Sequence, residues 1–488
     1  NMFGNDNTFI GHQSGLNNTL DGVYEGEANT FVGGFSGFSN TIGCFNTFIG
    51  TNTGFFNQTA INLTFVGHNS GYYNTTGRKN TFIGAGAGFY NDHDDQGEAT
   101  GDSNTFIGYT AGFKNRDGDN STFVGSEAGY SNITGFENTF VGHNSGHDNS
   151  SGYKNSFLGK DSGEANTEGY HNTFIGHNSG LSNTTGYFNT FIGSAAGDSN
   201  INGKHNIFIG VNAGQANIGP PTENPANEDK GNRNVFIGNS AGYSNDEGFD
   251  NVFIGDQAGY DTKTGHSNTF VGKGSGSTNI DGTLNAFFGL SAGRGNEDGG
   301  GNTFTGASTG YLNTDQFYNT YVGTGSGFTF DVNGIGSENT FLGYSTGSGS
   351  SGSHNTFIGA RVGENAQGEN NIFIGSYIGS NKTVDNRLLI HNSATSYPLI
   401  YGEFDNSLVK IHGTLEMAEA VGPSDERMKK NVQPLESSLD KVSELNGVSF
   451  DWKTEDYGER GLSERRQIGL LAQEVEKVLP ELVRTGSD

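Results

Sequence analysis

One short block near the C-terminus carries side chains whose types and spacing could do chemistry. The block Ser424–Val432 reads Ser-Asp-Glu-Arg-Met-Lys-Lys-Asn-Val. Serine is a weak nucleophile until a base takes its proton, and lysine can be that base where burial lowers its pKa. Attack of the Ser424 hydroxyl on the carbonyl of Pro423 would pass through a five-membered ring, whereas attack on its own carbonyl needs a strained four-membered ring or a hydroxyl from another chain. Taken alone, such a block is more often a surface serine and lysine at the start of a strand, and Lys430 rivals Lys429 as the base.

An acidic stretch is the second candidate. It runs from residue 91 to residue 102 and carries Asp92, Asp94, Asp95, Glu98 and Asp102. Calcium favours clustered carboxylate oxygens, so the run Asp92-His93-Asp94-Asp95 could hold Ca²⁺. The run lacks the full spacing of a known calcium loop, a solvated charge run is the simpler interpretation, and we expect no cofactor. Recurring histidines such as His143 and His177 follow a strand-ending glycine, so we expect them at surface corners and not in a metal ladder.

The elements that must position these side chains are set by an internal repeat. An aromatic residue recurs in 21 units, and 14 of the 20 spacings between them are 17 residues; the others are 22, 24, 28, 20, 16 and 16. The register residues are Phe9, Phe31, Phe48, Phe65, Phe82, Phe106, Phe123, Phe140, Phe157, Phe174, Phe191, Phe208, Phe236, Phe253, Phe270, Phe287, Phe304, Tyr321, Phe341, Phe357 and Phe373. Near-constant spacing over so many units predicts a solenoid in which each unit stacks on the last.

Each unit predicts a short strand and two further corners. Asn172–Gly176, Asn-Thr-Phe-Ile-Gly, is rich in aromatic and β-branched residues and stops at glycine. Glycine stands two positions after the register aromatic in all 21 units, as a positive φ or close contact with the next coil would require. Asparagine and small residues at the corners suit tight turns, and asparagine can stack in ladders between coils. The fold class is therefore all-β, with a parallel β-solenoid, or β-roll, as its shaft.

Alternation along the strand predicts association of several chains. Phe174 and Ile175 are neighbours and must point to opposite faces. The position after the aromatic is apolar in 20 of 21 units, Thr305 being the exception. One row can fill the coil, but the other would form an exposed stripe that soluble monomers rarely tolerate. We expect copies of the chain to bury it, with threefold closure preferred; the alternative is that the second row packs under a neighbouring corner of its own chain.

The repeat resembles the heads of trimeric autotransporter adhesins, whose short Ser-Val-Ala-Ile-Gly blocks build a left-handed parallel β-roll. It is still more similar to the Asn-Thr-Phe-Ile-Gly-x-x-Ala-Gly repeats of long bacterial surface and phage-fibre proteins. The resemblance covers roughly residues 1–380 and implies an oligomeric fibre.

Composition excludes several classes of protein. With 81 Gly in 488 residues and only 16% charged residues, a conventional globular enzyme is unlikely, and collagen would need Gly at every third position. The net charge of −27 argues against nucleic acid as a partner. Cys44 has no second cysteine to pair with. No apolar run reaches the roughly 18 residues of a membrane span, and no signal peptide is visible. Because residue 1 reads as the inside of a repeat, we expect the natural N-terminus to lie upstream.

Beyond residue 380 the character of the chain changes. We predict a neck of short strands over 381–423, from the runs 386–391, 398–402 and 408–413, and a small α+β domain over 424–488. In that domain Leu435, Leu439, Val442 and Leu445 share one helical stripe that ends near Gly447, and Val448, Phe450 and Trp452 alternate as a strand. Residues 469–479 are apolar at helical spacing, with Pro480 ending the helix.

Two motifs in this last segment carry a family resemblance. The block Ser424–Val432 and the run Gln467–Val475, Gln-Ile-Gly-Leu-Leu-Ala-Gln-Glu-Val, together resemble the intramolecular chaperone domain of phage endosialidase tail spikes. The resemblance implies a domain that trimerises, guides folding of the fibre ahead of it and then cuts itself off. It implies a Ser–Lys dyad with Ser424 as nucleophile and Lys429 as base, and a cut beside Ser424 on a side that the sequence leaves open.

The sequence leaves three functions open. The first is an extracellular fibrous adhesin or appendage on a cell surface, with no enzymatic activity in the shaft and self-cleavage as its one reaction. The second is a phage or contractile-injection tail fibre on a virion that binds a host-surface glycan. The third, a tail-spike enzyme that degrades polysaccharide, is weakest, because no domain-sized insertion interrupts the repeats to hold a cleft.

Overall fold

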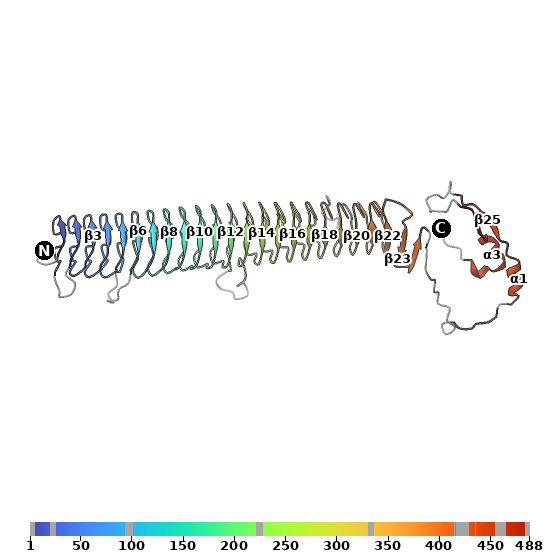
Figure 1. The fold of residues 1–488 in the computed structure, drawn as a ribbon, viewed down its shortest axis with the longest axis horizontal. Coiled ribbons are helices and arrows are strands. Elements are labelled where there is room, and N and C mark those ends of the chain that lie inside the picture. Colours follow the sequence, from blue (N-terminus) through green and yellow to red (C-terminus); the bar gives the residue numbers. More distant parts are fainter. Residues whose placement is uncertain are drawn as a thin grey trace.

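The computed structural model describes residues 5–19, 26–92, 101–220, 228–329, 336–413, 415, 429–434, 436–453 and 465–483. Twenty-one short strands lie one behind another along a single rod (Figure 1). Their bounds are β1 Thr8–Ile10, β2 Thr30–Val32, β3 Thr47–Ile49, β4 Thr64–Val66, β5 Thr81–Ile83, β6 Thr105–Ile107, β7 Thr122–Val124, β8 Thr139–Val141, β9 Ser156–Leu158, β10 Thr173–Ile175, β11 Thr190–Ile192, β12 Ile207–Ile209, β13 Val235–Ile237, β14 Val252–Ile254, β15 Thr269–Val271, β16 Ala286–Phe288, β17 Thr303–Thr305, β18 Thr320–Val322, β19 Thr340–Leu342, β20 Thr356–Ile358 and β21 Ile372–Gly375. The predicted parallel β-solenoid is confirmed.

A column of aromatic rings forms the core. Each strand pairs in parallel with the next, and register aromatic faces register aromatic, as Phe174 faces Phe157 and Phe191. The Phe174 ring is 0% exposed and stacks on the Phe191 ring with centroids 4.8 Å apart. That separation equals the spacing of hydrogen-bonded strands, so one backbone rise per coil also brings the rings into contact.

The invariant glycine is explained by the close approach of successive coils. Gly176 has φ 138°, and a Cβ on it would collide with the carbonyl oxygen of Gly193 in the next coil. Gly180, at the following corner, has φ 60°, and a Cβ there would strike the Phe174 ring at 2.6 Å. Both reasons that the sequence suggested for glycine, a left-handed backbone and close contact, therefore apply.

Two ladders of buried asparagines bind coil to coil, as the corner residues predicted. In the first, the Asn189 backbone N–H donates to Oδ1 of Asn172 (3.0 Å), and Nδ2 of Asn172 donates to the carbonyl of Gly186 (2.8 Å). In the second, Nδ2 of Asn200 donates to Oδ1 of Asn183 (2.7 Å). These asparagine side chains thus satisfy buried backbone groups and one another inside the coil.

The long spacings leave the ladder intact. Nδ2 of Asn115 reaches Oδ1 of Asn91 at 2.7 Å across 24 residues, and Nδ2 of Asn245 reaches Oδ1 of Asn217 at 2.8 Å across 28 residues. The coils on either side of each long spacing therefore keep the same register, as expected for insertions in a repeat protein.

The strands predicted for the neck are present. β22 (Arg387–His391) pairs in parallel with β21 and puts Leu389 where the coils have an aromatic. β23 (Ile400–Glu403) and β24 (Leu408–Ile411) then add in antiparallel fashion. The stacked geometry thus gives way to a meander directly after the last coil.

The C-terminal segment is mixed α and β, as predicted, with shorter elements. It holds α1 (Ser438–Ser443), β25 (Val448–Phe450), β26 (Gln467–Gly469), α3 (Ala472–Val478) and the 3₁₀ turn η4 (Pro480–Leu482). β25 and β26 pair antiparallel. The helix α1 ends at Glu444, which has right-handed backbone angles, so the prediction of a cap at Gly447 is wrong. Leu435 lies outside the described residues.

Candidate functional site: the fibre surface and the C-terminal segment

The outer face of the strands carries a long apolar row, which is interrupted at Thr305. Ile175 is 37% exposed although its neighbour Phe174 is 0% exposed, so the strand separates its two apolar rows as the alternation predicted. In-register pairing places Ile175 directly beside Ile192 of the next coil. Other exposed members of this row are Ile10, Ile49, Ile83, Ile107, Leu158, Ile254, Phe288 and Leu342. We call this row the outer stripe.

A corner of the N-terminal third carries a second column of rings, which the sequence reading missed. It comprises Phe38, Phe55, Tyr72, Phe89, Phe113, Tyr130 and His147, with centroids 4.9–5.2 Å apart. All seven rings are half-buried, and the stack leaves their edges, not their faces, toward solvent. The five-residue distance of each from the strand-ending glycine is the signal that reveals the column.

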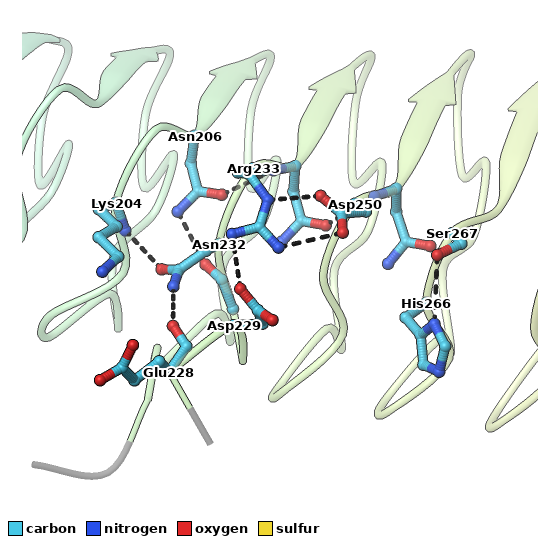
Figure 2. Close-up of polar contacts among 12 residues, drawn as sticks. Lys204, Asn206, Glu228, Asp229, Asn232, Arg233, Asp250, His266 and Ser267 are labelled. Carbon is cyan, nitrogen blue, oxygen red and sulfur yellow. Dashed lines mark hydrogen bonds and ion pairs between the residues drawn. The ribbon is translucent and has the colours of Figure 1, made fainter. Parts of the chain in front are cut away.

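An ionic cluster holds the chain where it re-enters the coil before β13. Arg233 contacts Asp250 of the next coil at 2.6 Å and Asp229 at 2.8 Å, and these bonds raise the pKa of Arg233 (Figure 2). Asn232 accepts a hydrogen bond from the Lys204 backbone at 2.8 Å and donates to the Glu228 carbonyl at 2.5 Å. Arg233 thus pairs with Asp229 and with Asp250, and this ionic cluster fixes the chain to the next coil.

The candidate calcium run is only partly visible. The carboxylate of Asp92 accepts hydrogen bonds from the Thr75 hydroxyl, from Thr76 and from the Gly77 backbone N–H. Asp94, Asp95 and Glu98 lie outside the described residues. Within the described ranges, no group of three or more His, Cys, Asp or Glu side chains is arranged to hold a metal ion.

The corner histidines are placed as expected. His143 is exposed, and its Nδ1 lies 3.7 Å from the Asp161 carboxylate. His177 is also exposed, at the corner after β10. Cys44 is buried with a free thiol.

Of the predicted Ser–Lys pair, the structure describes only Lys429. Ser424 lies outside the described residues. Lys429 and Lys430 are both exposed and precede α1, outside any helix or strand. A lysine needs burial to act as a base at neutral pH, and a single chain does not bury Lys429.

The C-terminal segment exposes most of its apolar side chains. In the part of it that is described, Leu479 is the one buried hydrophobic residue. Leu439 on α1 is 82% exposed and Ile468 on β26 is 87% exposed. Val432, Val442, Trp452, Leu470, Leu471 and Leu482 are exposed as well. A domain with so little internal core needs another surface to cover it.

Three side chains at the end of the shaft form a group that the sequence reading did not single out. The guanidinium of Arg361 lies over the rings of Tyr344 and Tyr377, 5.8 Å and 5.6 Å from their centroids. The shortened 16-residue spacing aligns Ser345, Arg361 and Tyr377 in one column, and that spacing is the signal that could have found the group.

Comparison with known proteins identifies the C-terminal segment. Residues 424–484 match the family model Peptidase_S74, described as chaperone of endosialidase. The chain is 46% identical over 65 residues to the Long tail fiber protein Gp37 of Enterobacteria phage K3, and also to that of Enterobacteria phage T2. Each match covers 13% of this chain and 5% of the relative, so the chain spans only a small part of the curated relatives. The resemblance of this segment to the endosialidase chaperone is thereby confirmed.

Two further findings complete the comparison. No solved structure matches the chain. No helix in the described part of the chain is long and apolar enough to cross a lipid bilayer.

Proposed function

We propose that this chain is the solenoid shaft of an extracellular fibre of the phage tail-fibre type, followed by a C-terminal domain that chaperones assembly of that fibre. The observation that carries the proposal is a chaperone-type segment joined to a long solenoid with an uncovered outer stripe. The relatives of that segment are long tail fibre proteins of phages, which favours a virion fibre over a bacterial surface adhesin. We place residues 1–380 in the shaft, 381–423 in the neck and 424–488 in the chaperone domain.

The chain works as a homotrimer in this proposal. The outer stripe runs the length of the shaft, and the exposed side chains Leu439 and Ile468 lie on separate elements of the C-terminal segment. Both surfaces are covered if copies associate side by side about one axis, and cyclic closure leaves no open apolar face. Three copies are the number that the chaperone resemblance implies.

The chaperone solves a register problem. A slip of one unit between nearly identical coils of neighbouring chains changes few local contacts, so the shaft itself sets register weakly. Pairing distant parts of three long chains is also slow. Association of the C-terminal domains first would align the chains, and removal of those domains afterwards would make the fold kinetically hard to reverse.

Self-cleavage is assigned to Ser424 as nucleophile and Lys429 as base. Lys429 is exposed in one chain, so we propose that the other copies bury it and lower its pKa. Cleavage would then follow assembly and not precede it. The partner of the finished fibre is a glycan or protein of the host surface, and no nucleic acid is involved, because the shaft is strongly acidic.

The proposal is tested by expressing the chain beside Ser424→Ala. We expect the wild-type chain to yield a shaft fragment and a fragment of about 65 residues, and Ser424→Ala to remain one chain of 51.6 kDa. Mass spectrometry reads the cut and sedimentation reads the oligomer. Lys429→Gln should block cleavage while Lys430→Gln should not, which separates the two candidate bases. One unchanged mass for wild type and variant alike would remove self-cleavage from the proposal, and sedimentation as monomers would remove the fibre.

A further inference from the structure

The last coils of the shaft present a cation between two exposed rings. Tyr344 is 53% exposed and Tyr377 is 45% exposed, and the Arg361 guanidinium lies against both. Both rings therefore leave a large part of their surface open beside a positive charge.

The fold does not require these side chains. Arg361 and Tyr377 occupy the position two residues after the strand-ending glycine, with φ 53° and 56°. In earlier coils the same position has a similar φ and holds small residues such as Asn178 and Ser308, but also large ones such as Phe35 and Glu127. The fold therefore accepts different side chains at this corner and does not itself call for arginine or tyrosine there.

A hollow adjoins the group. It has a volume of about 240 Å³ and lies between the last coil and the loop that follows β22. Tyr377, Lys382, Ser380, Thr395 and Ser396 line it, together with Gly379 and Ala394. The Ser380 hydroxyl hydrogen-bonds to the Arg361 carbonyl at 3.1 Å, which ties the hollow to the arginine. The site therefore combines one aromatic wall, two hydroxyl-bearing corners and two cations.

The charges at this place differ from those of the ion-paired corners of the shaft. Several basic side chains pair directly with carboxylates, among them Lys273 with Asp256 and Arg233 with Asp250. Over the described residues, neither Arg361 nor Lys382 has a carboxylate within 4 Å. The carboxylate that acts on Arg361 from a greater distance is Glu364. In a chain of net charge −27, two cations without a close carboxylate beside a hollow can attract an anion.

We propose that Tyr344, Arg361, Tyr377 and Lys382 form a binding site for an acidic saccharide on the target surface. This assignment rests on the proposed fibre function and names the receptor chemistry of that fibre. The guanidinium and the ammonium bind the anionic group, and the exposed Tyr377 ring packs against the apolar face of the sugar ring. The Ser380 hydroxyl donates its proton to a backbone carbonyl and can accept from a sugar hydroxyl, whereas the Ser396 hydroxyl can accept and donate.

The anionic group has two sources on a bacterial surface, the carboxylate of an acidic sugar and the phosphate of a phosphorylated sugar. Both match the planar, five-donor guanidinium of Arg361. The probes are therefore a galacturonate oligosaccharide, mannose 6-phosphate and the neutral sugar maltotriose. We expect one or both of the acidic probes to bind and maltotriose to fail, and the stronger acidic probe identifies the source.

The test titrates the assembled chain with each probe by calorimetry. Arg361→Ser, which copies the residue of earlier coils, should weaken binding of the acidic probe roughly tenfold or more, because it removes a charge-assisted hydrogen bond. Glu364→Gln should strengthen it, because a repelling carboxylate is lost. Added salt should weaken binding to the wild-type chain.

Arg294→Ser is the matched control. Arg294 also lies over a tyrosine ring, that of Tyr311, at 5.7 Å, but it does not belong to the hollow. We expect this variant to bind the acidic probe as the wild type does. Equal binding of maltotriose, or full affinity in Arg361→Ser, would overturn the site.

Adsorption of the labelled chain to bacterial cells separates this site from the fibre function. Loss of adsorption in Arg361→Ser, but not in Arg294→Ser, supports the site. Adsorption that is unchanged in Arg361→Ser overturns the site and leaves the fibre function standing, whereas a wild-type chain that forms no oligomer and adsorbs to no cell counts against the proposed function itself.

Discussion

Two adjacent side chains of one strand, Phe174 and Ile175, meet opposite environments. The ring is enclosed by the coil and by the rings above and below it, and the aliphatic side chain stands on the outer surface. Strand alternation alone demands this separation, so it could be read from the sequence. Which row faces inward is decided by stacking: a flat ring matches the strand spacing, and a branched aliphatic chain fills a less regular space at the surface.

The carboxylate of Asp198 is partly buried in the coil, where its negative charge is unfavourable. Burial raises its pKa, and His177 opposes that effect only weakly. Its Oδ1 is buried and has no hydrogen-bond partner among the described residues. The folded chain therefore holds the proton more tightly than the unfolded chain, so the ionised carboxylate weakens the fold at neutral pH. That penalty disappears once the pH falls below about 4, where the unfolded carboxyl is protonated too.

We expect Asp198→Asn to melt at a higher temperature than the wild type at pH 7 and at the same temperature at pH 3. Thermal unfolding followed by circular dichroism at both pH values measures the difference. A variant that gains no stability at pH 7, or that gains equally at both, would show that the Asp198 charge does not weaken the fold.

Individual contacts across coils were harder to anticipate than the strand pattern. The reach of Asp92 to Thr75 and the position of Arg361 between two tyrosines depend on which residues the insertions and the 16-residue spacings bring side by side. The aromatic row gives the register of the strands, but it does not say which side chains meet at each corner. Ser424 remains a prediction, because the described residues do not include it.

At the scale of the element, successive coils are held together mainly by the asparagine ladders, because each coil contributes only a short strand. Strands of three residues are too short to be stable as an ordinary sheet. The asparagine ladders supply buried hydrogen bonds at each corner, and their exceptions are informative. Thr262 stands where the second ladder has asparagine, and both its hydroxyl and Oδ1 of Asn245 lack partners within the described chain.

Repair of that gap is expected to stabilise the shaft. In Thr262→Asn, the new Nδ2 can donate to Oδ1 of Asn245, and the new Oδ1 can accept from Asn279. One or two restored buried hydrogen bonds are worth roughly 1–3 kcal/mol. Because a solenoid unfolds locally, amide hydrogen exchange in the coils around β14 and β15 is the suitable measurement.

Thr264→Asn is the control, since Thr264 is an exposed residue of the same corner that already hydrogen-bonds to Asp281. It should slow exchange in neither coil. Faster exchange in Thr262→Asn would mean that the corner has adapted to threonine and that the ladder does not govern its stability.

Element types were predictable where the pattern was periodic. The shaft strands and the three neck strands follow from alternation and glycine, whereas α1 is only six residues long and begins after the residue that opened its predicted stripe. Short helices with little buried surface are set by packing against other groups. The exposed Leu439 and Val442 show that one chain does not supply those groups.

At the scale of the whole molecule, the outer stripe is the feature that favours association of several rods. A row of aliphatic side chains over twenty coils is too long to be left in water in a soluble protein. Its straightness follows from the fixed register of every strand pair, so copies can align along their full length. In the proposed fibre, the acidic surface elsewhere would keep the assembly soluble.

Shortening the stripe should weaken assembly without unfolding the coil. Thr305 already occupies this row in β17, so Ile175→Thr, Ile192→Thr and Ile209→Thr place a tolerated residue in three consecutive coils. If the stripe is buried between copies, each change removes roughly 1–2 kcal/mol per chain from the interface. Sedimentation velocity across a dilution series should then show dissociation at a higher protein concentration than for the wild type.

The control Ile133→Thr, Ile201→Thr, Ile218→Thr changes exposed isoleucines that each follow an asparagine of the second ladder, and it should leave assembly unchanged. Equal dissociation of both triple variants, or a wild-type chain that sediments as single rods, would mean that the stripe is not the surface through which the chains associate.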